Sequence, residues 1–322
     1  MRKIGLVGTR GRWSTVLPAC FLLLLVVAAV FAPLVAPHDP AGINVALRNN
    51  PPGTSGAGLT YLLGTDALGR DELSRLIFGA RISLTVSALS VLLSGLIGVA
   101  LGLVAGFYRG WRDTVIMRAV DLQMGLPSLL LALLVLYVLG PGFQNVVLVL
   151  ALTRWMIYAR LVRGIMLSLR ERQFFEAVQQ LGASDARVLL RHALPNVIRP
   201  VAVLAVLEMA TVMLVESSLD FLGLGIQSPE ASWGLMLAEG KNYMTIAWWQ
   251  VTLPGLAIML TALSLNLVAG QLGPRPNRVV RIGGPRLPRP GSRRHRAADA
   301  VDASPATALA EDRRHRDVRT DR

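Results

Sequence analysis

Four ionisable side chains interrupt otherwise apolar stretches of the sequence, and they have the clearest capacity for chemistry. They are Asp121, Arg154, Glu208 and Glu216. A charge inside a bilayer core is costly, so such residues usually pair with one another or line a water-filled path. Glu208 lies in the middle of its stretch. We therefore expect Glu208 to face the protein interior or such a path, with Arg154 of the preceding stretch as its candidate partner.

The other two carboxylates lie nearer the ends of their stretches. Asp121 is close to Arg118, and we expect it to stay hydrated or to pair with this arginine. Glu216 begins the run E-x-x-L-x-F-L-G-L-G, where the carboxylate could cap a helix or remain solvated. Neither position requires a catalytic role.

Motifs for nucleotide hydrolysis and metal chemistry are missing from the sequence. The nearest imitation of a phosphate-binding loop, G-L-M-L-A-E-G-K-N at 234–242, is one residue too long and ends in Asn242 rather than Ser or Thr. No two of the four histidines share metal-ligand spacing, and the single cysteine is Cys20. We therefore predict no catalytic residue, no metal site and no cofactor bound by this chain.

A polar, arginine-rich loop follows Arg154 and extends to Asn196. Within it, residues 170–181 place apolar side chains at helical spacing, which predicts an amphipathic helix at the membrane surface. Gly182 suits the end of that helix, and Ala183, Ser184 and Asp185 can begin another. Pro195 disfavours a helix through the residue before it, so we expect the loop to stop near Leu194.

The elements that carry these residues are predicted to be membrane-spanning helices. The 322 residues are 53% hydrophobic and 16% charged, and the apolar residues come in blocks. A bilayer core of roughly 30 Å needs about 20 apolar residues in a helix. Six stretches approach or exceed that length, at 16–35, 82–107, 119–139, 144–162, 197–219 and 246–269. Arg154 interrupts the fourth, so five to seven spans remain open.

Charge asymmetry predicts the orientation. Lys and Arg favour loops that remain in the cytoplasm. The net charge is +13, and the basic residues concentrate in the N-terminus, the second and fourth loops and the C-terminal tail, whereas 36–81 and 220–246 are balanced or acidic. Six spans with both termini in the cytoplasm satisfy this division. Topology explains the charge more simply than nucleic-acid binding does.

The predicted organisation has four parts. Residues 1–35 form a cytoplasmic N-terminus and a first span, which we expect to be an uncleaved anchor rather than a signal peptide, because its apolar run is long. Residues 36–81 form an exterior loop with a short amphipathic stretch near 71–81. Residues 82–270 form the transmembrane core, with the polar loop at about 170–196. Residues 271–322 are rich in Arg and Pro and are predicted to be a disordered, solvated tail, with contact of its arginines to anionic lipid as the alternative.

Several runs resemble those of binding-protein-dependent ABC importer permeases. Glu176, Ala177, Gly182, Leu194 and Pro195 are similar to the E-A, G and L-P positions of the family's coupling loop. The segment L-G-T-D-A-L-G-R-D at 63–71 and the runs D-F-L-G-L-G at 220–225 and S-W-G-L-M-L at 232–237 are typical of the dipeptide, oligopeptide and nickel subgroup. The resemblance covers about residues 15–269. Asp220 stands where the family commonly has Ser, and we expect this change to lie outside the membrane with little effect.

This resemblance implies an all-α polytopic membrane protein with six transmembrane helices and the type I ABC importer transmembrane fold. It implies a permease subunit in the cytoplasmic membrane that works with a homologous permease, two ABC ATPase subunits that use ATP, and an exterior solute-binding protein. The loop would receive the ATPase: Glu176 would offer a carboxylate, Gly182 would allow close backbone approach, and Ala177 and Ala183 would keep the surface small. Glu216 would help to shape an exterior gate.

Three alternatives stay open. The cargo of such a permease could be a peptide, chelated nickel or another small solute. A secondary transporter would need coupling-ion carboxylates near the midplane, for which Glu208 is the single candidate. An assembly or receptor protein could use the basic loop to recruit a partner without transport.

Overall fold

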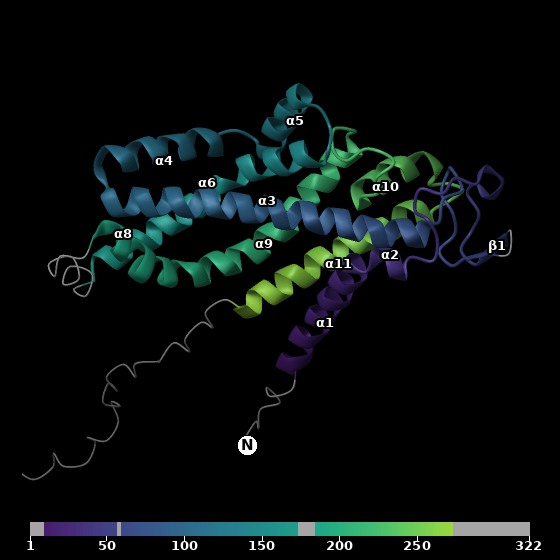
Figure 1. Cartoon of the computed structure of the whole chain (residues 1–322), viewed down its shortest axis with the longest axis horizontal. Helices are drawn as coiled ribbons and strands as arrows, with labels where there is room; N and C mark the ends of the chain where they lie inside the picture. The colour runs from purple at the N-terminus through teal and green to yellow at the C-terminus, as the bar shows by residue number, and fades with distance from the viewer. Residues whose placement is uncertain (1–9, 57–58, 173–183, 273–322) are drawn as a thin grey trace, which may run out of the picture. The chain divides into compact units, whose positions relative to one another are not determined.

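The structure, a computed structural model, describes residues 10–56, 59–172 and 184–272 (Figure 1). Within these ranges the regular structure is helical apart from an antiparallel pair of short strands, β1 (Thr54–Gly56) and β2 (Leu59–Tyr61). The predicted all-α class is confirmed. Residues 273–322 lie outside the described ranges, and so does the prediction of a disordered tail.

Four helical runs in the described residues are long and apolar enough to cross a membrane. They are α3 (Glu72–Tyr108), α6 (Phe143–Arg170), the run Asp185–Phe221, and α11 (Trp249–Leu272). A bent pair, α4 (Gly110–Met124) and α5 (Ser128–Leu139), makes a fifth if it is counted as one span. The first predicted span is α1 (Arg10–Val30), whose apolar part Val16–Val30 is shorter, followed by α2 (Ala32–Val35). Every predicted stretch thus coincides with helix, although the first and third are not single long spans.

The third stretch differs from the prediction of one helix over 119–139. α4 and α5 meet at a bend of 91°. Pro127 precedes α5 in an extended conformation, with φ −60° and ψ 115°. Proline has no amide hydrogen for a helix bond and disfavours helical backbone in the residue before it, so it breaks the helix here rather than kinking it.

The second span begins earlier than predicted. α3 starts at Glu72 rather than near residue 82, so the expected amphipathic stretch and the apolar span form one helix of 37 residues. Asp71 occupies the N-cap, and its carboxylate accepts a 2.9 Å hydrogen bond from the Ser74 amide. This cap satisfies a free amide of the first turn and fixes the start of the helix.

The expected stop near Leu194 is wrong, because the backbone passes through Pro195 without leaving the helix. α8 (Asp185–Val188) leads into a π-helical turn, η2 (Leu189–Ala193), and then into α9 (Leu194–Phe221). The Leu194 amide donates to the Leu189 carbonyl. The wider π turn accommodates the proline ring and its missing amide hydrogen at the first turn of α9, so the helical run is continuous.

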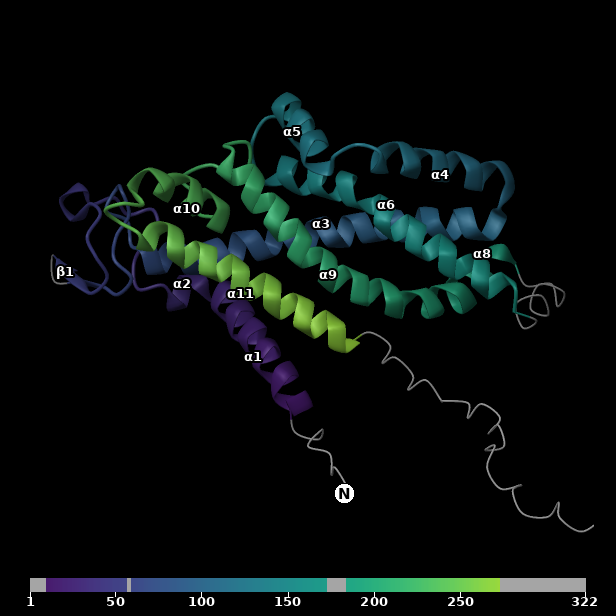
Figure 2. The same cartoon turned by 180° about the vertical axis from the view of Figure 1, so that it is seen from behind.

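α3 and α6 form the centre of the bundle. Figures 1 and 2 show them side by side along most of their length, and α9 packs on α3. α11 packs against α9 and α1. The main apolar core lies among α3, α5, α6 and α9 and includes Val86, Leu136, Leu150 and Met166, all with no exposed surface. Three glycines of α3 allow the close approach to α6, because added Cβ atoms at Gly98, Gly102 and Gly106 would overlap α6 atoms.

The ends of α3 and α11 carry a compact group of shorter elements. This group contains η1 (Val45–Leu47), the β1–β2 pair, α10 (Trp233–Gly240) and η3 (Lys241–Tyr243). Figure 1 places β1, α2 and α10 at the same end of the helices. The group comes from the two segments that the sequence predicts to be exterior, so we name it the outer group.

Candidate functional site

The polar loop lies between two helices of the described residues, α6 and α8. α6 ends at Arg170 and α8 begins at Asp185. Glu176, Ala177, Gly182 and Ala183 lie outside the described residues, so their coupling role stays a prediction. Leu194 is half-buried and Pro195 is exposed. Ser184 occupies the N-cap position of α8 as expected, but its side chain makes no capping hydrogen bond.

Two arginines of α6 connect this end of the bundle to α4. The Arg163 guanidinium donates to both Asp113 carboxylate oxygens, at 2.5 and 2.7 Å. Arg160 Nη2 donates to Asp121 Oδ1 at 2.5 Å, so Asp121 pairs with Arg160 rather than with Arg118. The Arg163 pair is bidentate and better shielded from water, and it should contribute more than the exposed Arg160 pair. The sequence-based reasoning missed Asp113; its spacing of eight residues from Asp121 on one helix was the available signal.

Arg170 adds a third connection at the last turn of α6. Its Nη1 donates to the Phe107 carbonyl near the end of α3. Together the three arginines hold α3, α4 and α6 to one another immediately before the loop. A frame of this kind can transmit movement of the loop to three helices.

The expected pairing of Arg154 with Glu208 is present. Arg154 Nη1 lies 3.7 Å from Glu208 Oε2, and the two side chains are only 11% and 10% exposed. The distance is longer than a hydrogen bond, so the contact is an ion pair between α6 and α9. The attraction between the two charges offsets part of the cost of burying them inside the bundle.

Glu216 is neither solvated nor at an edge. It is fully buried in α9, and it accepts hydrogen bonds from Ser83 Oγ of α3 at 3.1 Å and from Ser217 Oγ at 3.3 Å. The carboxylate therefore joins α9 to α3. Glu216 and the Arg154–Glu208 pair are separate sites in the structure, since no contact joins them among the described residues.

The prediction that Asp220 matters little is wrong. Asp220 is fully buried in the last turn of α9, and it accepts hydrogen bonds from the Ile226 amide, at 2.7 Å, and from the Ser232 hydroxyl. Gly225 lies so close to the Asp220 carboxylate that a Cβ at Gly225 would overlap it. The carboxylate thereby folds the 223–226 turn back onto α9 and holds the start of α10. The sequence did not show this because the turn that brings these residues together is not visible in the apolar pattern.

Four charged residues where the outer group meets the start of α3 form a closed network that we name the outer ion cluster: Asp66, Arg70, Arg75 and Glu239. Arg70 binds Asp66 at 2.5 Å and Glu239 at 2.8 Å, while Arg75 binds Asp66 and, at 2.7 Å, Glu239. Asp66, Arg70 and Arg75 are at most 5% exposed as side chains, and Glu239 is 29% exposed. Each arginine bridges both carboxylates, so the cluster ties α10 to the start of α3.

Tryptophan and glutamine side chains add uncharged connections within the outer group. Trp233 Nε1 donates to the Leu76 carbonyl at 3.0 Å, and Trp249 Nε1 donates to the Thr65 carbonyl at 3.1 Å. Gln250 Nε2 donates to Asn49 Oδ1 at 2.8 Å. These bonds give Trp233 of the S-W-G-L-M-L run and Trp249 structural roles, and they fix the outer group to α3 and α11.

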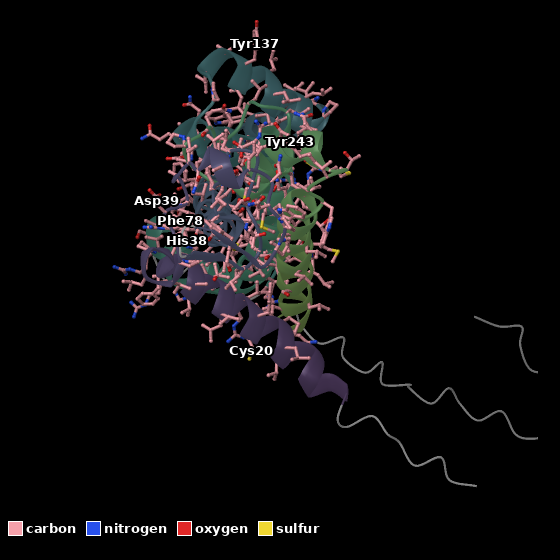
Figure 3. All side chains as sticks on the ribbon, turned by 90° about the vertical axis from the view of Figure 1, so that its right-hand side faces the viewer. Cys20, His38, Asp39, Phe78, Tyr137 and Tyr243 are labelled. Carbon is pink, nitrogen blue, oxygen red and sulfur yellow. The ribbon has the colours of Figure 1, made fainter. Side chains whose placement is uncertain are left out.

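Other side chains with reactive groups, Cys20, His38 and Tyr137, lie at separate places in the structure. Figure 3 shows Cys20 at the surface of α1 and Tyr137 at the tip of α5, where it is 78% exposed. His38 stacks on Tyr61 and lies 3.3 Å from Asp71, in contact with the outer group. No group of three His, Cys, Asp or Glu residues in the described part of the chain could hold a metal ion.

Long apolar helices, buried ion pairs between them and a polar loop between α6 and α8 define a polytopic membrane protein. Residues 98–278 match the family of binding-protein-dependent transport system inner membrane components, and the chain belongs to this family. Residues 16–52 also match the N-terminal transmembrane domain of oligopeptide transport permease C. The family suggested by the sequence is therefore confirmed, as is a transport subunit of the membrane.

Three relatives show the range of names within the family. The di/tripeptide transport system permease protein DppC of Pseudomonas aeruginosa is 43% identical over 78% of this chain and 84% of its own. The glutathione transport system permease protein GsiD of Escherichia coli O6:K15:H31 is 41% identical, with 79% of this chain and 82% of its own covered. The probable D,D-dipeptide transport system permease protein DdpC of Escherichia coli K12 is 36% identical over 80% and 85%.

Proposed function

We propose that this chain is the transmembrane permease subunit of an ATP-driven importer for peptides. The observation that carries the proposal is the set of relatives named for di/tripeptide, D,D-dipeptide and glutathione transport, which align over 78–80% of this chain. Their named cargoes share peptide-like bonds and charged termini. Chelated nickel or another small solute is the alternative cargo for the same family.

The proposed energy source is external to the chain. Two ABC ATPase subunits would grip the 170–196 loop, a homologous permease would complete the path, and an exterior binding protein would deliver cargo. This requires the loop and both termini to be cytoplasmic, as the basic loops predict. The connections from Arg160, Arg163 and Arg170 support the proposal, because they let force on the loop reach α3 and α4 as well as α6. ATP would supply conformational bias through the partners, with no cofactor bound here.

We propose the Arg154–Glu208 pair as a polar site that lines the translocation path. It is about one-tenth exposed, so water or cargo arriving between α6 and α9 would reach both charges. Glu216 is a weaker candidate for direct contact because it is fully buried. We propose that Glu216 acts on the exterior gate through its bond to α3.

The transport function is tested first by uptake. Cells that lack this chain should lose accumulation of a labelled dipeptide, and re-expression should restore it. Restoration should fail when the partner ATPases carry inactive nucleotide sites, because this chain has no hydrolytic motif. Restored uptake with inactive ATPases would favour a secondary transporter. If cells that lack this chain take up dipeptide normally but no longer take up nickel, the cargo is nickel and not a peptide.

The coupling role of the loop predicts that Gly182→Asp or Glu176→Lys abolishes uptake while the protein reaches the membrane in normal amount. An added side chain at Gly182 would block close backbone approach, and a lysine at Glu176 would reverse the charge offered to the partner. Dipeptide uptake and quantitative immunoblots of membranes measure both effects. The matched control is Glu230→Lys, an exposed carboxylate outside the 170–196 loop, which should leave uptake unchanged. Wild-type uptake in both loop variants would refute the coupling role.

A further inference from the structure

A two-part groove lies along α6 and α9, next to the polar loop. One cavity of about 500 Å³ and a second of about 390 Å³ share Arg160 and Leu161 in their walls. The first lies at the end of α6 where the loop begins, and the second continues along the two helices toward Leu207. The two cavities therefore adjoin at Arg160 and Leu161, and we name them together the groove, whose two ends differ in chemistry.

The end near the loop is polar and positively charged. Arg160, Ser168, Arg172 and Asn196 line it. Arg172 is exposed and forms no ion pair with any residue that the structure describes. The Arg160 side chain is half exposed, and one of its nitrogens bonds Asp121, which leaves further guanidinium hydrogens available. Guanidinium groups in the wall of this cavity offer donors that fit a phosphate group.

The other end is almost entirely apolar. Its walls are Met124, Ile157, Pro200, Val203, Leu204 and Leu207. A translocating peptide would leave its amides without partners there, at a cost of roughly 1–3 kcal/mol for each group. A helix from another subunit could fill the apolar end but would not neutralise the two arginines. An acyl chain joined to a phosphate satisfies both ends.

We propose that this groove binds one anionic phospholipid, with its phosphate at the end that Arg160 and Arg172 line and one acyl chain along Leu204. The argument is charge complementarity at one end and apolar complementarity at the other, within a chain of membrane helices. The lipid then lies in a groove over the two helices that flank the loop. The site does not depend on the proposed cargo, and the proposed orientation decides only which leaflet supplies the lipid.

Native mass spectrometry of the purified full complex tests this site. The complex is released from bilayers that contain equal amounts of phosphatidylglycerol and phosphatidylcholine. The wild-type complex should retain phosphatidylglycerol in excess. Arg172→Gln should lower that retention about fivefold, because one basic residue near an anionic head group is removed. Leu204→Trp should lower it too, by filling the apolar end while leaving both arginines.

The control is Arg187→Gln, which removes an exposed arginine of α8 that lines neither cavity. It should retain lipid as the wild type does. Equal retention of the two lipids, or unchanged retention in Arg172→Gln, would overturn the proposal. So would oxidative disulfide formation between Ser168→Cys and a cysteine introduced into the partner permease, which would make the groove a subunit interface. Lipid retention is measured without transport, so its failure would leave the uptake test untouched.

Discussion

Gly102→Ala is expected to lower the stability of the folded protein by about 1–3 kcal/mol, and Gly102→Leu should prevent accumulation in the membrane. An alanine Cβ at this position would lie 2.6 Å from the Ala159 carbonyl oxygen and 2.8 Å from Val162 Cβ. Both atoms belong to the core of α6, which cannot move without disturbing its own packing. Gly98→Ala should behave similarly, because its Cβ would overlap the Trp155 carbonyl and approach Tyr158 Cβ at 2.6 Å.

The detergent-solubilised protein is heated, and the fraction that remains monodisperse is measured. The temperature at which this fraction falls to half is the midpoint of thermal denaturation for each variant. Gly95→Ala is the matched control on the same helix, since its added Cβ would meet only Tyr158 Cε1, at 3.8 Å. This variant should be neutral or slightly stabilised, because alanine is the better helix former. Equal losses at Gly95 and Gly102 would show that the close approach of α3 to α6 is not the cause.

Arg75→Ala should destabilise the outer group by about 3–5 kcal/mol, the usual effect of removing one partner from a buried ion pair. Arg75 is 2% exposed as a side chain and bridges Asp66 and Glu239, so its loss leaves both carboxylates with Arg70 as their remaining partner in the cluster. Arg75→Lys should rescue poorly, because one ammonium lacks the fork that reaches both carboxylates. Protease sensitivity of segment 36–71 in spheroplasts would report the loosening directly.

The control is Arg81→Ala, an exposed arginine further along α3 with no ion pair among the described residues. It should leave protease sensitivity unchanged. Glu239→Gln in the Arg75→Ala background should recover part of the lost stability, because it removes one of the carboxylates left short of charge. If the double variant is no better than Arg75→Ala alone, the two residues are not coupled.

The sequence predicted those features that the membrane itself imposes. Apolar length predicted where helices lie, and the cost of a buried charge predicted that Glu208 would find Arg154. Short sequence motifs shared with the permease family identified the class of transport protein. These signals are local, or they connect neighbouring spans, so a single sequence displays them.

Features that depend on distant contacts were not predictable in the same way. The Arg70–Glu239 bond joins residues 169 positions apart, and neither residue lies in a pattern that indicates the other. The burial of Asp220 depends on a turn that returns the chain to α9. The continuation through Pro195 depends on a π turn, which no residue preference announces. The sequence-based prediction stopped the helix near Leu194 but continued it through Pro127, whereas the backbone does the opposite and breaks the helix at Pro127 but not at Pro195.

α3 carries two attachment points on one uninterrupted rod: Arg75 near its start and the glycines from Gly98 to Gly106 further along. Each residue of a helix advances the side-chain direction by about 100°. Inserting or deleting one residue between the two points would turn the glycines away from α6, or the arginine away from Glu239. Two further turns would nearly restore the direction but shift the attachment points by roughly 10 Å. The number of residues between the two attachment points therefore fixes their relative direction, and it can change only if the contacts at both points change with it.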